Sequence, residues 1–192
     1  MKTKSVMLCG VGGQGILLAS DLLSKVMMKK GLDVKKSEVH GMSQRGGTVV
    51  SNVRFGEKVF SPLIGKADAD IILAFEKLEG LRHIEFLKQN GVIIVNDYEI
   101  EPLPVASGLA EYPENVIGVI QNTIKDTVVL DAFSIAKKAG SARSINIVLL
   151  GVLARKLEID KETWYNAIEE RLPEKTWEIN KKAFDLGYEF IK

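Results

Sequence analysis

Glycines crowd a short segment near the start of the chain, Gly10-Val11-Gly12-Gly13-Gln14-Gly15. Its G-x-G-x-x-G spacing lies between an apolar stretch, Ser5 to Cys9, and a segment of helical periodicity that begins at Ile16. Such glycines permit a sharp turn and a close approach of a ligand to backbone N–H groups at the start of a helix. We therefore expect Gly10, Gly12, Gly13, Gln14 and Gly15 to contact a phosphate or carboxylate; a tight turn without a ligand is the alternative.

A second run of polar residues and glycines extends from Ser37 to Gly47. The guanidinium of Arg45, beside Gly46-Gly47, can form paired bonds to a phosphate or a carboxylate. For His40 we favour a structural or interface role over acid–base catalysis, because Glu38 is its one nearby partner in the sequence. We expect this run to form a partner interface or a substrate-positioning loop, and a surface loop without a ligand is the alternative. Its candidate residues are Glu38, His40, Ser43, Gln44, Arg45, Gly46 and Gly47.

Other reactive residue types give weaker signals. Cys9 ends an apolar strand and is expected to be a buried small hydrophobe rather than a nucleophile. Asp68 and Asp70 precede another apolar strand, where they are expected to end the sheet or cap a turn rather than bind a metal. One cysteine and two histidines are too few for an iron–sulfur cluster or a zinc site of the usual kind. We therefore predict no metal site and name no catalytic residue.

Composition excludes several classes of protein. The chain has 192 residues and a net charge of +1, which disfavours a protein that coats nucleic acid. The longest apolar stretch, Ile147 to Ala154, is far below the roughly 20 residues that span a membrane. A single cysteine fits the reducing cytoplasm. We expect a cytoplasmic protein of one domain, residues 1–192, with an α/β core over 1–130 and a helical part over 131–192.

The elements that position these residues alternate between strand and helix, which is typical of an α/β fold. We expect strands at 5–9, 33–39, 71–75, 91–96, 116–120 and 128–130, a hairpin with arms 48–55 and 58–60, and a mostly parallel but mixed sheet. Helical periodicity predicts helices from Ile16 to about Gly31, over 77–89, and over 132–139, 144–157, 161–171 and 175–191. The aromatic residues of the last helices are expected to pack in the core; they are Trp164, Tyr165, Trp177, Phe184 and Tyr188.

These motifs together resemble the gamma-type domain of the 2-oxoacid:ferredoxin oxidoreductases, most of all the beta subunits of the indolepyruvate type. The resemblance is carried by the segments 10–17, 37–47, 53–56 and 60–64 and by Asn146 within the helix 144–151. It implies a Rossmann-like three-layer domain with a β-hairpin extension and C-terminal helices.

The resemblance also implies a reaction. An aryl 2-oxoacid of the indolepyruvate type, coenzyme A (CoA) and oxidised ferredoxin give aryl-acetyl-CoA, CO2 and reduced ferredoxin. Thiamine diphosphate and iron–sulfur clusters are expected on a larger alpha subunit, so this chain would bind no cofactor firmly and be inactive alone. Whether the glycine segment would bind CoA, thiamine phosphates or nothing stays open. The alternatives are a stand-alone Rossmann NAD(P)-dependent oxidoreductase and a non-catalytic nucleotide-binding or assembly module.

Overall fold

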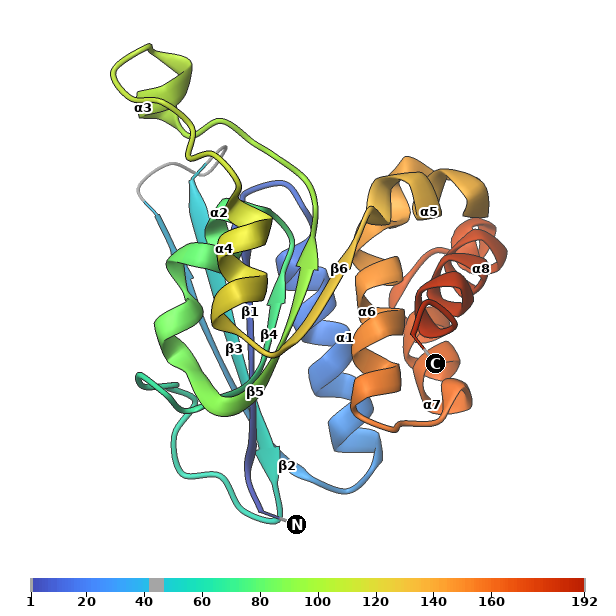
Figure 1. The fold of residues 1–192 in the computed structure, drawn as a ribbon. Helices are drawn as coiled ribbons and strands as arrows, with labels where there is room; N and C mark the ends of the chain where they lie inside the picture. Colours follow the sequence, from blue (N-terminus) through green and yellow to red (C-terminus); the bar gives the residue numbers. More distant parts are fainter. Residues whose placement is uncertain (1, 42–46, 192) are drawn as a thin grey trace.

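The computed structural model describes residues 2–41 and 47–191, which form a six-stranded sheet with helices on both faces (Figure 1). The strand order is β2-β3-β1-β4-β5-β6. β1, β4, β5 and β6 run parallel to one another, whereas β3 is antiparallel to both β1 and β2. The strands are β1 (Lys4–Val11), β2 (Asp33–His40), β3 (Thr48–Gly56), β4 (Ala69–Ala74), β5 (Leu87–Asn96) and β6 (Asp126–Leu130).

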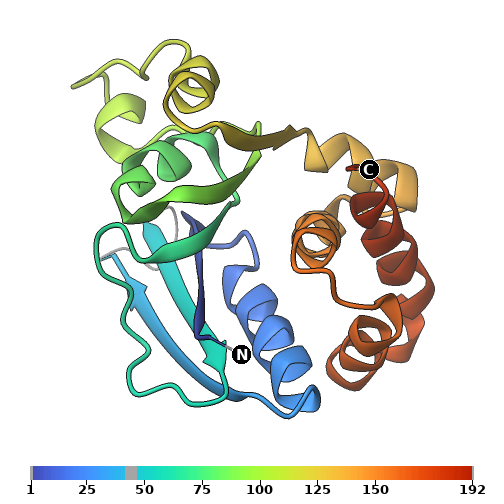
Figure 2. The same cartoon turned by 60° about the horizontal axis from the view of Figure 1, so that its bottom comes forward.

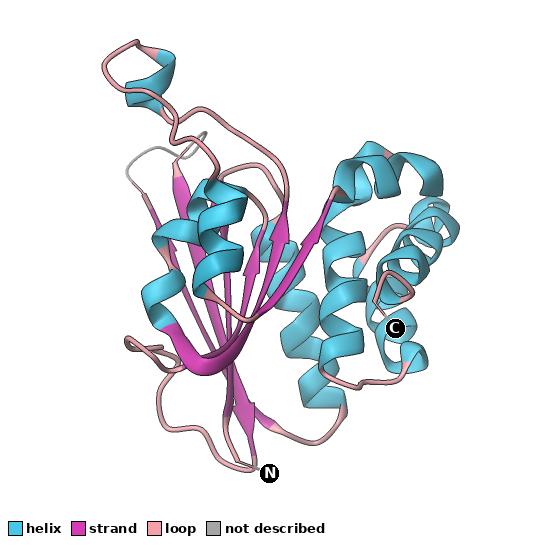
Figure 3. Cartoon of the chain, viewed as in Figure 1, coloured by secondary structure: helices cyan, strands magenta, loops and turns pink. Residues whose placement is uncertain are grey.

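The helices form layers on the two faces of the sheet. α2 and α4 cover one face, α1 and α6 cover the other, and α7 and α8 pack outside them (Figures 2 and 3). The α-helices are α1 (Ile16–Lys29), α2 (Lys77–Arg82), α3 (Leu103–Ala106), α4 (Val116–Thr123), α5 (Ala132–Ala139), α6 (Ile145–Lys156), α7 (Lys161–Arg171) and α8 (Trp177–Tyr188). Short 3₁₀ turns are η1 (Ile84–Phe86), η2 (Ala142–Ser144) and η3 (Glu174–Thr176).

Two apolar clusters fill the space between these layers, because successive side chains of a strand point to opposite faces of the sheet. On β1, Val6 and Leu8 join α1 and the C-terminal helices, whereas Met7 and Cys9 join the cluster beneath α2 and α4. The predicted packing of aromatic residues in the last helices is confirmed for Trp164 and Phe184, which are fully buried with their ring centroids 5.6 Å apart.

The mixed sheet is confirmed, but the predicted hairpin arm at 58–60 is wrong. β3 already has a strand on each side, because Phe55 lies opposite Lys4 of β1 and Val34 of β2. No edge of β3 is left to accept a further strand. Instead, the N–H of Val59 donates to the carboxylate of Asp33 at 2.8 Å, and the antiparallel arm next to β3 is β2.

Two other sequence predictions are wrong in the middle of the chain. The helix predicted over 77–89 ends at Arg82, because Leu87 already pairs with Ala69 and the chain from Leu87 onward forms β5. The strand predicted over 116–120 is helix α4, in which Val116 and Ile120 are buried one turn apart against the sheet face. In both segments β-strand and helix patterns overlap, and packing decides between them.

No helix in the described ranges is long and apolar enough to cross a membrane.

Candidate functional site

The glycine segment forms the turn from β1 into α1, as the sequence predicts. Gly13 and Gly15 have positive φ values of 101° and 79°, a backbone conformation that glycine adopts without steric cost. Gly15 is the residue before α1, and no side chain caps that helix. The first N–H groups of α1 and the positive end of its dipole therefore point toward the space above the turn.

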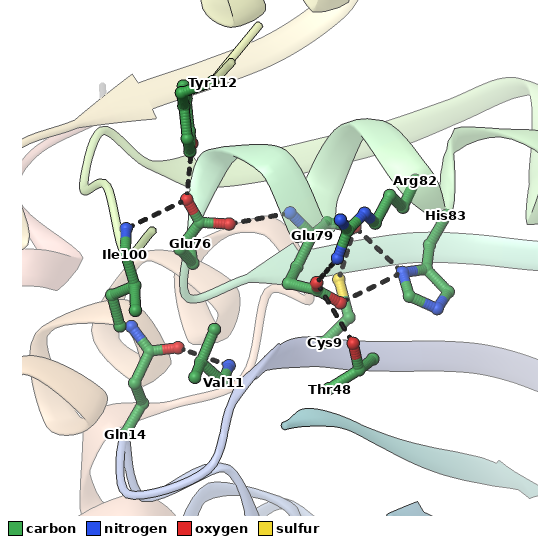
Figure 4. Close-up of polar contacts among 10 residues, drawn as sticks. All are labelled: Cys9, Val11, Gln14, Thr48, Glu76, Glu79, Arg82, His83, Ile100 and Tyr112. Atoms are coloured by element: carbon green, nitrogen blue, oxygen red, sulfur yellow. Dashed lines mark hydrogen bonds and ion pairs between the residues drawn. The ribbon is translucent and has the colours of Figure 1, made fainter. Parts of the chain in front are cut away.

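Gln14 holds the turn in place through both ends of its side-chain amide. Its Oε1 accepts a hydrogen bond from the N–H of Val11 at 2.7 Å (Figure 4). Its Nε2 donates to the carbonyl of Phe75 at 2.9 Å. This ties the end of β1 to the end of β4. These interactions give Gln14 a positioning role within the chain, and the ligand contact that the sequence predicts for it stays a prediction.

Close contacts surround the rest of the turn. The N–H of Gly12 donates to the carbonyl of Gly47 at 2.9 Å, so the two glycine-rich motifs of the sequence meet here. Asn146 of α6 lies against Gly15: a Cβ atom at Gly15 would be 2.7 Å from its Nδ2. Gly10 packs equally tightly against the Cβ of Phe75, at 2.8 Å for a Cβ atom. Gly10 and Gly15 therefore have no space for a side chain.

A groove of about 520 Å³ lies beside the turn. Backbone of the turn, apolar residues at the start of α1 and three titratable side chains line it. The lining residues are Val11, Gly12, Gly13, Gly15, Ile16, Leu17, Leu18, Asp21, His40, Val49 and Arg171. Arg171 and the N-terminus of α1 provide positive charge, and the leucines provide an apolar wall, so the groove suits a ligand with an anionic and an apolar part.

A row of charged residues borders this groove. Lys36 forms ion pairs with Asp21 and, at 2.7 Å, with Glu38, while Glu38 lies 3.7 Å from the Nε2 of His40. Burial lowers the pKa of Lys36, but hydrogen bonds to the two carboxylates outweigh it, so the pKa is raised. The structure thus brings Glu38 and His40 together, at a distance longer than a hydrogen bond.

Four other residues predicted in the run 37–47 lie outside the described residues; they are Ser43, Gln44, Arg45 and Gly46.

Two buried acids near the turn, Glu76 and Glu79, were not predicted from the sequence (Figure 4). Glu76 caps the N-terminus of α2, where its Oε2 accepts a hydrogen bond from the N–H of Glu79 at 2.8 Å. Glu79 receives bonds from Arg82 and from the hydroxyl of Thr48, at 2.5 and 3.2 Å. Both acids are almost completely buried. Two acids three residues apart, directly after an apolar strand, are a helix-start signal that could have found them.

Cys9 lies next to these acids and is fully buried, as the sequence predicts. Burial, together with the charges of Glu79 and Glu76, raises the pKa of its thiol well above the ordinary value. The thiol donates to the carbonyl of Glu79 at 3.6 Å and is a poor nucleophile in this state. Asp70 accepts a bond from the N–H of Ser5 at 2.7 Å and pairs with Lys88, the structural role expected for it.

An iron–sulfur cluster does not fit the described residues. Within 2–41 and 47–191, no three His, Cys, Asp or Glu side chains lie close enough to hold a metal ion. The buried, neutral Cys9 is the single thiol of the sequence. The groove at the turn is equipped to bind and orient a ligand, and it presents no activated nucleophile among the described residues.

Comparisons with known proteins decide the family. The profile of the pyruvate ferredoxin/flavodoxin oxidoreductases matches residues 5–190. The chain belongs to this family. The resemblance predicted from the glycine motifs is therefore confirmed, and so is the mixed α/β fold.

Several relatives share the full length of the chain. An indolepyruvate oxidoreductase subunit IorB from Pyrococcus horikoshii is 39% identical over 100% of this chain and 98% of its own length. The gamma subunit of a keto/oxoacid ferredoxin oxidoreductase from Geobacter sulfurreducens has a similar structure, with a TM-score of 0.72, 25% identity and 97% of both chains covered.

A further solved structure carries a similar fold inside a longer chain. The 2-oxoglutarate:ferredoxin oxidoreductase from Magnetococcus marinus matches with a TM-score of 0.75 and 21% identity. The match covers 99% of this chain but 31% of that one. The fold of this chain is therefore about a third of a larger polypeptide in that enzyme.

Proposed function

We propose that this chain is the smaller subunit of a heteromeric 2-oxoacid:ferredoxin oxidoreductase. Its complex converts an aryl 2-oxoacid of the indolepyruvate type, CoA and oxidised ferredoxin into aryl-acetyl-CoA, CO2 and reduced ferredoxin. Thiamine diphosphate and iron–sulfur clusters belong to the larger subunit. The observation that carries this proposal is the 39% identity to an indolepyruvate oxidoreductase subunit over the full length of both chains.

A stand-alone NAD(P)-dependent enzyme is disfavoured by the order of the strands. In the dinucleotide-binding fold, the acid that holds the ribose ends a strand adjacent to β1. Here β3 separates β2 from β1, and the carboxylate of Glu38 on β2 pairs with Lys36. Glu38 therefore lacks the position that this chemistry requires.

Within the complex, the groove at the glycine turn contributes a binding surface for an anionic group, and a phosphate of CoA is the candidate. The uncapped N-terminus of α1 and the guanidinium of Arg171 support this role. A purely structural turn is the alternative, and the use of Gly12 and Gln14 in bonds within the chain favours it.

Reconstitution tests the proposed reaction. The purified chain, the larger subunit and their mixture are assayed for viologen reduction that depends on an arylpyruvate and CoA. We expect turnover from the mixture and none from this chain alone, because its described residues offer no cluster ligands and no activated nucleophile. Clear turnover by the chain alone would contradict the proposal.

The same assay separates the two roles of the turn. Arg171→Gln removes a charge-assisted bond worth roughly 1.5–3 kcal/mol, so we expect the KM for CoA to rise about ten- to a hundredfold. Arg155→Gln serves as the matched control, because Arg155 packs over Tyr188 on another surface. An unchanged KM for CoA in Arg171→Gln and in Gly12→Val would leave the turn with a structural role only.

A further inference from the structure

A protruding segment, residues 97–114, leaves the body of the molecule between β5 and α4 and carries α3 at its tip (Figures 1 and 2). We call it the finger. Its tip is held by bonds within itself: Val105 N–H donates to the carbonyl of Pro102 at 2.9 Å and Leu109 N–H to that of Pro104 at 2.8 Å. The finger is therefore a folded projection rather than an extended loop.

Two leucines at the tip are almost fully exposed. Leu103 and Leu109 expose 80% and 84% of their surface, although each would be stabilised by burial. Exposed apolar side chains on a structured projection are the kind of anchor that fills a pocket on a partner protein.

Negative charge surrounds these leucines. The finger contains five acids and no Lys, Arg or His, whereas the whole chain has a net charge of +1. Lys77 neutralises part of this charge at the base, through Glu99 at 2.8 Å and Asp97 at 3.8 Å. The other three acids, Glu101, Glu111 and Glu114, are exposed and form no ion pair within the described part of the chain. A partner surface must therefore be basic around an apolar pocket.

The buried carboxylate of Glu76 holds the two ends of the finger together at its base (Figure 4). The Oε1 of Glu76 accepts bonds from the N–H of Ile100 at 3.4 Å and from the hydroxyl of Tyr112 at 2.7 Å. Burial and this bond raise the pKa of Tyr112, so its hydroxyl stays a donor at neutral pH. Because the finger is ordered before binding, docking it costs less conformational entropy than docking a flexible loop.

We propose that the finger inserts Leu103 and Leu109 into an apolar pocket of the larger oxidoreductase subunit, whose rim of Lys and Arg side chains pairs with Glu101, Glu111 and Glu114. This inference rests on the proposed function. Relatives of this length are named as subunits, and in the Magnetococcus marinus enzyme two thirds of the polypeptide lies outside the matching fold. Exposed apolar residues at the tip, with exposed acids around them, are the composition expected of the core and rim of such an interface.

The experiment measures binding of the full chain to the immobilised larger subunit by biolayer interferometry. Leu103→Ser/Leu109→Ser is expected to weaken binding at least tenfold, mainly through faster dissociation. The matched control is Phe60→Ser/Leu63→Ser, whose side chains are 85% and 64% exposed in the connection from β3 to β4. The control should bind within twofold of the wild type, and both pairs should keep the wild-type melting temperature.

A second variant tests the charges. Glu101→Gln/Glu111→Gln/Glu114→Gln should slow association about tenfold at low salt and flatten its dependence on ionic strength. Wild-type kinetics in both finger variants, or an equal loss in the Phe60/Leu63 control, would overturn the docking surface and leave the proposed function standing. No binding by the wild-type chain would overturn both proposals. A finger-dependent dimer of this chain, seen by sedimentation without the larger subunit, would assign the surface to a second copy and overturn the inference.

Discussion

Gly15 occupies a position where two requirements coincide. The backbone must take a φ of 79° to turn from β1 into α1, and a Cβ atom there would lie only 2.7 Å from the Nδ2 of Asn146. Gly13, two residues earlier, has only the first requirement: its φ is 101°, and a Cβ atom added there would meet nothing within 4 Å. Comparing substitutions at Gly13 and Gly15 therefore distinguishes the cost of backbone strain from the cost of close packing.

Replacing each of these glycines by alanine should reveal the difference. Gly13→Ala is expected to lower the free energy of unfolding by about 1–2 kcal/mol through strain alone. Gly15→Ala should cost about 1–3 kcal/mol more, because its methyl displaces Asn146. Urea denaturation measures both values. A double-mutant cycle with Asn146→Ala should show coupling at Gly15 and none at Gly13, and equal costs at both glycines would contradict the close-packing argument.

The sequence predicts residues well where the backbone conformation imposes the residue type. The glycine turn and the buried Cys9 follow from local rules. The burial of Glu76 and Glu79 could not be predicted in the same way, although their place at the start of a helix could. Acids are usually exposed, and their burial depends on partners such as Tyr112 and Thr48 that lie far away in the sequence.

At the scale of elements, the sequence is informative where periodicity is long and ambiguous where it is short. The helices 132–139 and 161–171 have the predicted bounds, because a polar cap and amphipathic spacing agree. In short apolar segments there is no polar cap or amphipathic spacing to distinguish a helix from a strand. Residues 116–120 resemble a strand in their β-branched side chains, but β6 already occupies the edge of the sheet next to β5, and the segment packs above it as α4.

The finger shows how one element depends on a single side chain in another. Tyr112→Phe removes the donor to the buried carboxylate of Glu76, so we expect a loss of about 1–2 kcal/mol and looser attachment of the finger. Hydrogen–deuterium exchange should become faster across residues 97–114 and stay unchanged in α1. Tyr98→Phe is the matched control, because its side chain is 41% exposed and its hydroxyl forms no hydrogen bond with the described residues. Equal exchange in the two variants would contradict the role of Glu76 as an anchor of the finger.

The whole molecule is held together by α6, which has the sheet on one side and α8 on the other. One apolar cluster runs from Val6 of β1 through Val148 of α6 to Phe184 of α8. The two helices touch through their backbones: a methyl at Gly151 would overlap the carbonyl of Phe184, and one at Gly187 would overlap that of Val148. No side-chain rotation can relieve an overlap with backbone, so the helices would have to separate.

Gly187→Ala should therefore weaken the entire fold rather than α8 alone. Overpacking of this kind costs about 1–3 kcal/mol or more, and we expect a loss of at least about 2 kcal/mol in urea denaturation. Gly65→Ala is the matched control, because a methyl there meets nothing within 4 Å, and it should change stability by less than about 0.5 kcal/mol. Because Trp164 packs on Phe184 within the cluster shared with the sheet, tryptophan fluorescence and far-ultraviolet circular dichroism should shift together. If the fluorescence midpoint falls while part of the circular dichroism signal unfolds at the wild-type midpoint, the outer helices unfold separately from the rest of the chain. The shared cluster would then not couple the sheet to the outer helices.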